Sequence, residues 1–322
     1  MNDTNPPSAS DAALDPKRPR QTARDFHPEV LRLFDAYVHG SIDRRAFLER
    51  AGRFAAAGVT AAALLDALNP RFAEAQQVPP NDSRIDTSFV ELDSPSGYGK
   101  VRSYQVRPAK AAGKLPIVLV VHENRGLNPH IEDVARRLAL EGFLAVAPDA
   151  LFPLGGYPGD EDKAREKFST LDQAKTREDF LAVARALKRD PRGNGKLGVV
   201  GFCYGGGIAH MLATRLPELD AAVPFYGMSP APEEAKNVKA ALLVQLADQD
   251  ERINAAWPAY EAALKAAKVS FEVYKYPGTQ HGFNNDTTPR FDEAAAKLAW
   301  QRTLTLFKRT LVAAGPAAAS KS

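Results

Sequence analysis

Residues 197–206, Leu-Gly-Val-Val-Gly-Phe-Cys-Tyr-Gly-Gly, decide the fold of this chain of 322 residues. The first half is a short apolar run with β-branched residues, which favours a strand buried on both faces of a parallel sheet. The second half places glycines on both sides of Cys203, and a helical pattern covers residues 207–216. The stretch therefore predicts a strand, a tight turn that carries Cys203, and a helix.

The surrounding sequence repeats this alternation of strand and helix. Buried strands are also predicted at residues 116–121, 144–147 and 241–246, and further strands at 87–92, 101–107, 221–226 and 270–276. Helices are predicted at residues 131–140, 177–188, 207–216, 255–267 and 291–312. Strands that alternate with helices indicate an α/β protein with a doubly wound, mainly parallel sheet and helices on both faces.

The composition is that of an ordinary globular protein, with 44% apolar and 25% charged residues. The net charge of +3 is small, and Lys and Arg form no dense patch interleaved with aromatic residues, so nucleic-acid binding is not expected. The chain has a single cysteine, which rules out an intrachain disulfide.

The N-terminal residues differ in composition from the rest. The first 25 or so are rich in Pro, Ser, Ala, Asp and Arg and are predicted to be disordered. Apolar residues at helical spacing then predict a helix over residues 27–39. We therefore divide the chain into an N-terminal arm, residues 1–75, and a catalytic domain, residues 76–322.

Part of the arm resembles a twin-arginine export signal. Arg44-Arg45 is followed by Phe47-Leu48, an apolar run at 54–65 and Ala73-Glu74-Ala75, which predicts cleavage before Gln76. The run is too short to cross a bilayer about 30 Å thick as a helix. One interpretation is export by the twin-arginine translocase to the periplasm or beyond. The other is a cytoplasmic protein that retains the arm, packed on the catalytic domain or on a partner subunit in an oligomer.

The turn around Cys203 has the pattern of a nucleophile elbow, with Cys in place of Ser. Gly201 and Gly205 suit it because a side chain two residues before or after the nucleophile would clash in so tight a turn. The nucleophile then lies at a helix N-terminus, where backbone N–H groups favour a thiolate. A buried structural cysteine is the alternative, and the partners below favour the nucleophile.

Two further residues complete a catalytic triad. Asp250 follows the strand at 241–246, and His281 follows the strand at 270–276. The order nucleophile, acid, base is that of α/β-hydrolases. Asp248 competes with Asp250, which we prefer because the loop needs a turn before the acid can point inward.

The other histidines show no spacing typical of a metal site, so neither metal nor cofactor is expected. They are His27, His39, His122, His130 and His210.

The loop after the first buried strand supplies the remaining candidates. The backbone N–H groups of Asn124 and Tyr204 are the expected oxyanion hole. The carboxylate of Glu123, at the C-terminal edge of the sheet, would face the thiol.

Four motifs together resemble the dienelactone hydrolase family, over about residues 89–311. They are Glu-Asn-Arg-Gly-Leu-Asn at 123–128, Gly-Phe-Cys-Tyr-Gly-Gly-Gly at 201–207, the Asp250 loop and His-Gly-Phe at 281–283. The resemblance implies an α/β-hydrolase fold and a triad of Cys203, His281 and Asp250. It also implies that Glu123 interacts with the resting thiol and that the reaction opens an enol lactone to a keto acid.

One position departs from that family's pattern. Members that cleave dienelactone resemble one another in an arginine four residues after the catalytic His, where this chain has Asn285. The expected substrates are therefore small esters or lactones more broadly, hydrolysed through a thiol acyl-enzyme. Arg125, Tyr226 and Trp257 are the candidate substrate contacts. A general carboxylesterase or thioesterase, and a redox-sensing or binding protein that uses Cys203, are the alternative functions.

Overall fold

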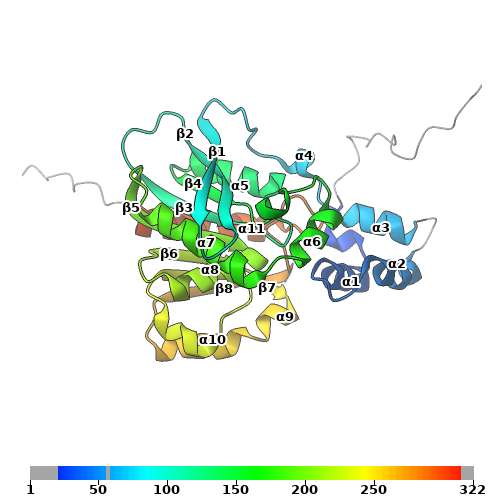
Figure 1. Cartoon of the computed structure of the whole chain (residues 1–322). Coiled ribbons are helices and arrows are strands. Elements are labelled where there is room, and N and C mark those ends of the chain that lie inside the picture. The colour runs from blue at the N-terminus through cyan, green and yellow to red at the C-terminus, as the bar shows by residue number, and fades with distance from the viewer. Residues whose placement is uncertain (1–20, 56–58, 313–322) are drawn as a thin grey trace, which may run out of the picture.

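Eight strands form one sheet in the computed structural model, which describes residues 21–55 and 59–312 (Figure 1). The strands are β1 (Ile85–Ser94), β2 (Gly99–Pro108), β3 (Leu115–Val121), β4 (Leu144–Pro148), β5 (Gly193–Phe202), β6 (Ala221–Phe225), β7 (Ala241–Gln249) and β8 (Phe271–Gln280). Their order is β1-β2-β4-β3-β5-β6-β7-β8. β2 pairs antiparallel with both of its neighbours, β1 and β4, and every pair from β4 to β8 is parallel. The mainly parallel sheet predicted from the sequence is confirmed.

Helices cover both faces of the sheet. Those of the catalytic domain are α5 (Pro129–Leu140), α6 (Glu161–Ser169), α7 (Gln173–Lys188), α8 (Tyr204–Arg215), α9 (Glu251–Asn254), α10 (Trp257–Ala266) and α11 (Glu293–Leu311). Short 3₁₀ turns lie at Phe152–Leu154 and Pro232–Asn237. The α6 and α9 helices were not predicted from the sequence.

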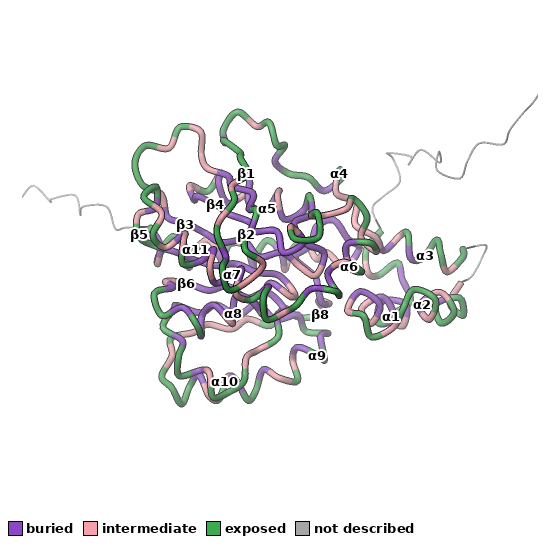
Figure 2. The backbone as a smooth tube through the Cα atoms, in the orientation of Figure 1, coloured by how far each residue is buried: buried purple, intermediate pink, exposed green. Residues whose placement is uncertain are grey.

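The core has two layers because alternate side chains of each strand point to opposite faces. In β3, Ile117 and Leu119 pack into the layer under α7, α8 and α10, whereas Val118 and Val120 pack into the layer under α5 and α11. Figure 2 shows the buried residues concentrated along the sheet and the inner sides of these helices. Burial on both faces explains the uninterrupted apolar runs in the sequence.

The arm folds as three helices with a small core of their own. After a 3₁₀ turn at Ala23–Asp25 come α1 (Pro28–Val38), α2 (Arg44–Ala51) and α3 (Ala61–Leu68), with a 3₁₀ turn at Gly52–Phe54. Their buried residues include Phe34, Tyr37, Phe47, Leu65 and Leu68. The helix predicted at 27–39 is thus present as α1. Disorder was expected over the first 25 or so residues, and this is wrong at its end, where a 3₁₀ turn forms at Ala23–Asp25. Residues 1–20, and residues 56–58 of the apolar run, lie outside the described residues.

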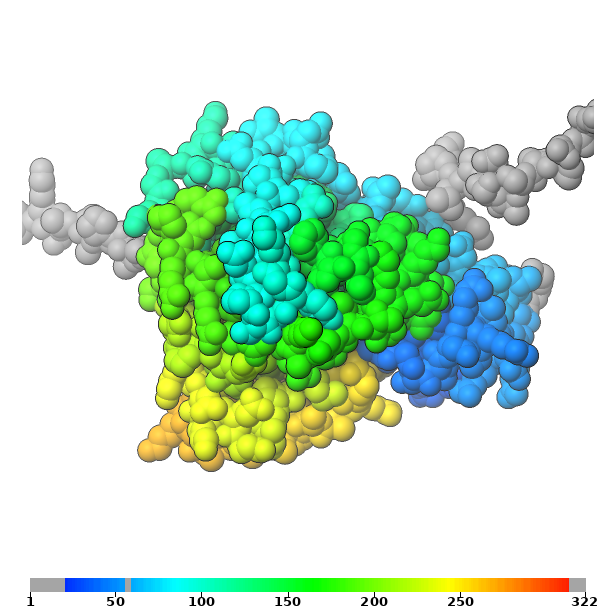
Figure 3. Space-filling model, viewed as in Figure 1, coloured from blue at the N-terminus to red at the C-terminus, as the bar shows by residue number. Residues whose placement is uncertain are grey.

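The arm packs on one end of the catalytic domain, next to α6 (Figures 1 and 3). The Tyr37 hydroxyl donates a hydrogen bond to the carboxylate of Asp162. The guanidinium of Arg165 lies 4.0 Å from the centroid of the Tyr37 ring. Arg44, the first arginine of the pair, forms a salt bridge with Asp162 at 3.4 Å. Because α2 begins at Arg44, both arginines of the export-like motif lie in its first turn.

The segment that joins the arm to β1 is held against α5. It begins with the short helix α4 (Phe72–Ala75), in which Ala75 is buried. The backbone N–H groups of Gln77 and Val78 then donate to the Asp133 carboxylate at 3.0 and 2.8 Å. Asp133 is also paired with Arg137. The predicted cleavage point before Gln76 thus adjoins an anchored stretch of chain.

No helix within the described ranges has the length and apolar character needed to cross a membrane.

We predict that Gly201→Ala destabilises the protein, whereas Gly207→Ala does not. A Cβ on Gly201 would lie 1.9 Å from the carbonyl oxygen of Gly205, in backbone that cannot move aside. We expect a loss of about 3 kcal/mol or more in the free energy of unfolding. A Cβ on Gly207 meets nothing closer than 3.7 Å, and alanine is the better helix former. Urea unfolding of both variants measures the difference, and equal stabilities would contradict this account of the elbow.

Candidate active site

Cys203 occupies a strained turn between β5 and α8. Its φ of 55° and ψ of −113° are rare for a residue with a side chain. Its N–H donates to the carbonyl of Phe225 at 3.1 Å, which ties the turn to β6. Because α8 begins at Tyr204, the Tyr204 N–H has no acceptor within the helix and is available to an oxyanion. The turn therefore places the thiol beside a backbone donor at the C-terminal edge of the sheet.

His281 and Asp250 lie together, both buried. The His281 Nδ1 donates to Asp250 Oδ2 at 2.6 Å, and Asp250 Oδ1 accepts the Ile253 N–H at 3.3 Å. Asp248, the competing acid, is exposed and accepts the Gly278 N–H at 3.1 Å instead. The structure thus brings Asp250 to the histidine. Its bond to Nδ1 leaves Nε2 to face the thiol.

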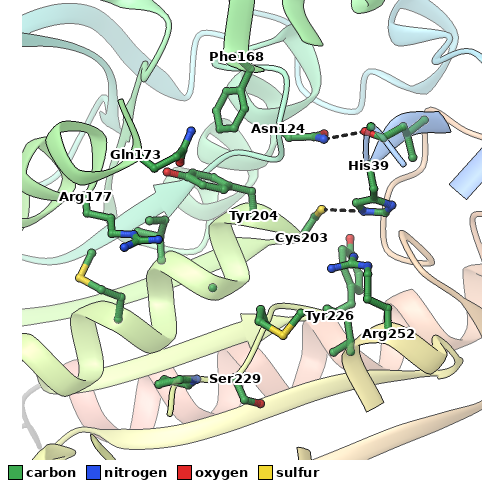
Figure 4. Close-up of a pocket in the computed structure, with 18 of the residues that line it drawn as sticks. His39, Asn124, Phe168, Gln173, Arg177, Cys203, Tyr204, Tyr226, Ser229 and Arg252 are labelled. Atoms are coloured by element: carbon green, nitrogen blue, oxygen red, sulfur yellow. Dashed lines mark hydrogen bonds between the residues drawn. The ribbon is translucent and has the colours of Figure 1, made fainter. Parts of the chain in front are cut away.

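A second imidazole, from the arm, also faces the thiol. His39 follows the last residue of α1, and its Nε2 lies 3.5 Å from Cys203 Sγ (Figure 4). Its ring packs edge-on against that of His281, with the centroids 4.6 Å apart. No local pattern predicts this contact, because 164 positions separate His39 from Cys203.

The three side chains form a compact group. Within the described ranges, His39, Cys203 and His281 are the one set of His, Cys, Asp and Glu donors close enough to share a cation, with their donor atoms all within 4.8 Å of one another. The spacing of histidines along the sequence did not predict such a group. The same arrangement is that of an acid–base site around a thiol.

The charges in this group favour an ionised thiol. Burial raises the pKa of Cys203, but the neighbouring His281 and His39 outweigh it and lower this pKa to about 6. Burial lowers the pKa of His281, but the Cys203 thiolate and the hydrogen-bonded Asp250 outweigh it and raise this pKa to about 10. Both pKa shifts favour a Cys203 thiolate paired with a His281 imidazolium.

Glu123 lies in the same part of the site and is hydrogen-bonded to a residue on another loop. Its Oε2 accepts a hydrogen bond from Asn285 Nδ2 at 3.1 Å. Glu123, Asn285, Cys203 and His281 line one narrow cavity together with residues of the arm. The residue that departs from the family pattern, Asn285, thus contacts the candidate glutamate.

Arg125, a candidate substrate contact, lines the same narrow cavity, but protein groups hold its guanidinium. It is buried, its Nε lies 3.5 Å from Glu161, and its Nη1 donates to Asn124 Oδ1 at 2.6 Å. A buried guanidinium needs a carboxylate partner, and Glu161 supplies it. Substrate binding by Arg125 stays a prediction, because its guanidinium is already engaged and yet borders the cavity beside the thiol. The side chain of the neighbouring Asn124 donates to the Val38 carbonyl of the arm at 2.8 Å.

A cavity of about 670 Å³ opens beside Cys203, and Figure 4 shows part of its wall. Tyr226, a candidate substrate contact, lines it with a φ of 36° and its ring centroid 4.9 Å from that of His281. Trp257, the third candidate, is packed in the core against Tyr260 and Phe271 and does not line this cavity. Sequence alone could not separate a wall aromatic from a core aromatic.

Two arginines that sequence reasoning missed also line the cavity. The structure gives Arg177 and Arg252 no hydrogen bond or ion pair with any described residue, so each has a free guanidinium for a ligand. Basic residues are common on polar helix faces, and so no sequence pattern distinguishes these two arginines from others.

Comparison with known families gives two matches along the chain. The sequence model of the dienelactone hydrolase family matches residues 101–311. A second model, described as YqhI-like, matches residues 18–56, which include α1, α2 and His39.

Individual relatives match parts of the chain. A "Putative carboxymethylenebutenolidase" of Escherichia coli K12 is 34% identical over 71% of this chain and 89% of its own length. A "Putative hydrolase fragment YghX" of the same organism is 54% identical over 35% of this chain and 97% of its own length. The crystal structure of a "Putative Dienelactone Hydrolase" from Klebsiella pneumoniae superposes with a TM-score of 0.61 at 33% identity, over 70% of this chain and 99% of that one.

Proposed function

The chain belongs to the dienelactone hydrolase family, and on that premise we propose that it hydrolyses small carboxylic esters or lactones by acyl transfer to Cys203. The observation that carries the proposal is the grouping of Cys203, His281 and Asp250. A strained thiol, a buried imidazole and an orienting carboxylate together make an activated nucleophile. Membership of the family makes the chain a carboxylic ester hydrolase, and the proposal concerns how its residues perform the reaction.

In the first step the Cys203 thiolate attacks the carbonyl carbon of the ester or lactone. The N–H groups of Tyr204 and Asn124 receive the oxyanion. Each such donor typically contributes roughly 3–4 kcal/mol to the barrier reduction. The C–O bond then breaks, and the leaving oxygen takes a proton from the His281 imidazolium. The products are a thioester on Cys203, a neutral His281 and an alcohol or enol.

In the second step water hydrolyses the thioester. Neutral His281, oriented by Asp250, takes a proton from water as the water oxygen adds to the carbonyl carbon. The C–S bond breaks, the electron pair returns to Sγ, and the acid is released. His281 is again an imidazolium beside a thiolate. Glu123 lines the same narrow cavity as the resting thiol.

The cavity favours a small substrate that carries negative charge. Its volume of about 670 Å³ accommodates a small molecule. The free guanidinium groups of Arg177 and Arg252 would pair with a carboxylate on such a substrate. Asn285 is uncharged and bound to Glu123, so it cannot form an ion pair with a substrate carboxylate. This agrees with substrates other than dienelactone.

We predict that Cys203→Ala and His281→Ala each abolish hydrolysis of p-nitrophenyl acetate by the full-length chain. Loss of the nucleophile or its base should lower kcat by a factor of about 10³ or more. Asp248→Asn, beside the triad acid, is the matched control and should retain activity, whereas Asp250→Asn should lose it. Turnover that survives Cys203→Ala would contradict the nucleophile assignment. Peroxide reactivity at Cys203 without ester turnover would favour the redox-sensing alternative.

Relative kcat/KM over aryl esters, lactones and thioesters separates a lactonase from a general carboxylesterase or thioesterase. The comparison should be made with the background hydrolysis subtracted for each substrate.

We predict a bell-shaped pH dependence of kcat/KM for an unactivated alkyl ester or lactone. The rate should rise near pH 6 as the Cys203 thiolate forms, and fall near pH 10 as His281 loses the proton that the leaving oxygen needs. An aryl ester is the internal control, because p-nitrophenolate leaves unprotonated and should lack the basic limb. An acid limb near the ordinary cysteine pKa of about 8.5 would contradict a thiolate resting state.

A further inference from the structure

We propose that Asp35 and His39 of the arm form a second acid–base dyad in the active site, and that the arm is therefore part of the catalytic machinery. The inference rests on the proposed function of Cys203. It goes beyond that function because the triad alone requires nothing from residues 1–75. His39 contacts the reacting atom itself, with its Nε2 at 3.5 Å from Sγ.

The two imidazoles are oriented in the same way. His281 Nδ1 is bound to the Asp250 carboxylate. His39 Nδ1 lies 2.8 Å from the carbonyl oxygen of Asp35 and 3.3 Å from its carboxylate Oδ1. In both residues this fixes Nδ1 as a donor and directs Nε2 at the thiol.

The catalytic domain holds the dyad in place. Arg290 Nη1 donates to Asp35 Oδ1 at 3.2 Å. The last carbonyl groups of a helix lack partners within it. Here those of Tyr37 and Val38 accept from Arg165 Nη1 at 3.0 Å and Asn124 Nδ2 at 2.8 Å. These bonds fix the end of α1, and with it the position of His39.

The arm forms a wall of the substrate cavity and does not fill it. Val38, His39 and Gly40 line the cavity together with Cys203 and Tyr204, and about 670 Å³ remains open. His39 therefore faces both the thiol and the space where substrate would bind. An inhibitory plug would be expected to occupy that space.

In the proposed reaction His39 acts as a hydrogen-bond donor to the Cys203 sulfur. At rest, the His39 Nε2–H donates to the Cys203 thiolate. When the tetrahedral intermediate of deacylation collapses, the C–S bond breaks and the electron pair passes to Sγ. His39 then donates to the departing thiolate, while His281 holds the proton taken from water. Water is the only co-reactant, and its second proton leaves with the acid product.

Other charged or ionisable groups surround the thiol. Glu123 is bound by Asn285, Arg125 is paired with Glu161, and the Tyr226 hydroxyl has no hydrogen-bond partner among the described residues. The two imidazoles are the groups in direct reach of the sulfur charge. The test accordingly compares variants of His39 with variants of His281.

The experiment measures how the rate of Cys203 alkylation by iodoacetamide depends on pH, which requires no substrate. We expect His39→Ala to raise the midpoint of this alkylation profile, which reports the pKa of Cys203, by about one pH unit or more. The reason is that one of two neighbouring positive charges is lost. In ester hydrolysis, kcat should fall with little change in KM, and added imidazole should restore part of it. His39→Gln should retain the arm contacts without restoring the midpoint.

His27→Ala is the matched control. This exposed histidine caps the N-terminal end of α1, the end opposite His39, and its Nδ1 accepts the Glu29 N–H at 3.1 Å. It should leave the alkylation profile and kcat unchanged.

A wild-type midpoint and kcat in His39→Ala would overturn the dyad, and the triad would still stand if His281→Ala loses activity. If the alkylation midpoint of the wild-type protein lies at the ordinary cysteine pKa, the result instead contradicts the thiolate resting state on which the proposed function rests. A fall in kcat that imidazole does not restore, accompanied by a lower melting temperature and a normal midpoint, would assign His39 to arm packing and also overturn the dyad.

Discussion

The close approach of backbone at the turn after β5 is the constraint on which the site depends. Gly201 and Gly205 leave no room for a side chain: a Cβ on either would lie within 2.3 Å of a carbonyl oxygen. This approach lets α8 begin directly over the ends of β3 and β6. The same geometry forces Cys203 to a positive φ and directs its thiol to the edge where the loops after β3, β7 and β8 meet. Glu123, Asp250 and His281 come from those loops.

The charged groups at that edge of the sheet determine whether the Cys203 thiol is ionised. A buried cysteine in apolar surroundings would remain protonated. Here two imidazoles face it, each bound on its far nitrogen to a residue that orients it. The arm contributes one of them, so a chain cleaved before Gln76 would lose His39 from the site. Export with removal of the arm and catalysis with His39 therefore exclude one another in the mature enzyme.

Much of the catalytic domain could be predicted because its signals are local. The strand-turn-helix around Cys203 follows from glycine spacing and an apolar run, and Asp250 and His281 each follow a recognisable strand. The contacts that sequence reasoning missed join distant segments. His39 reaches Cys203 only through the docking of α1, and Arg125 meets Glu161 through a helix, α6, that was not predicted. Trp257 is a core residue because of the packing of α10, which no local pattern reveals.

The measurement that tests the central claim most directly is identification of the acyl-enzyme. The full-length protein should be mixed with p-nitrophenyl acetate, quenched in acid within the first turnover, digested and analysed by mass spectrometry. The account predicts one acetyl group on the peptide that contains Cys203, which disappears as turnover completes. An acetyl group on another residue, or rapid turnover with no adduct at any quench time, would contradict it.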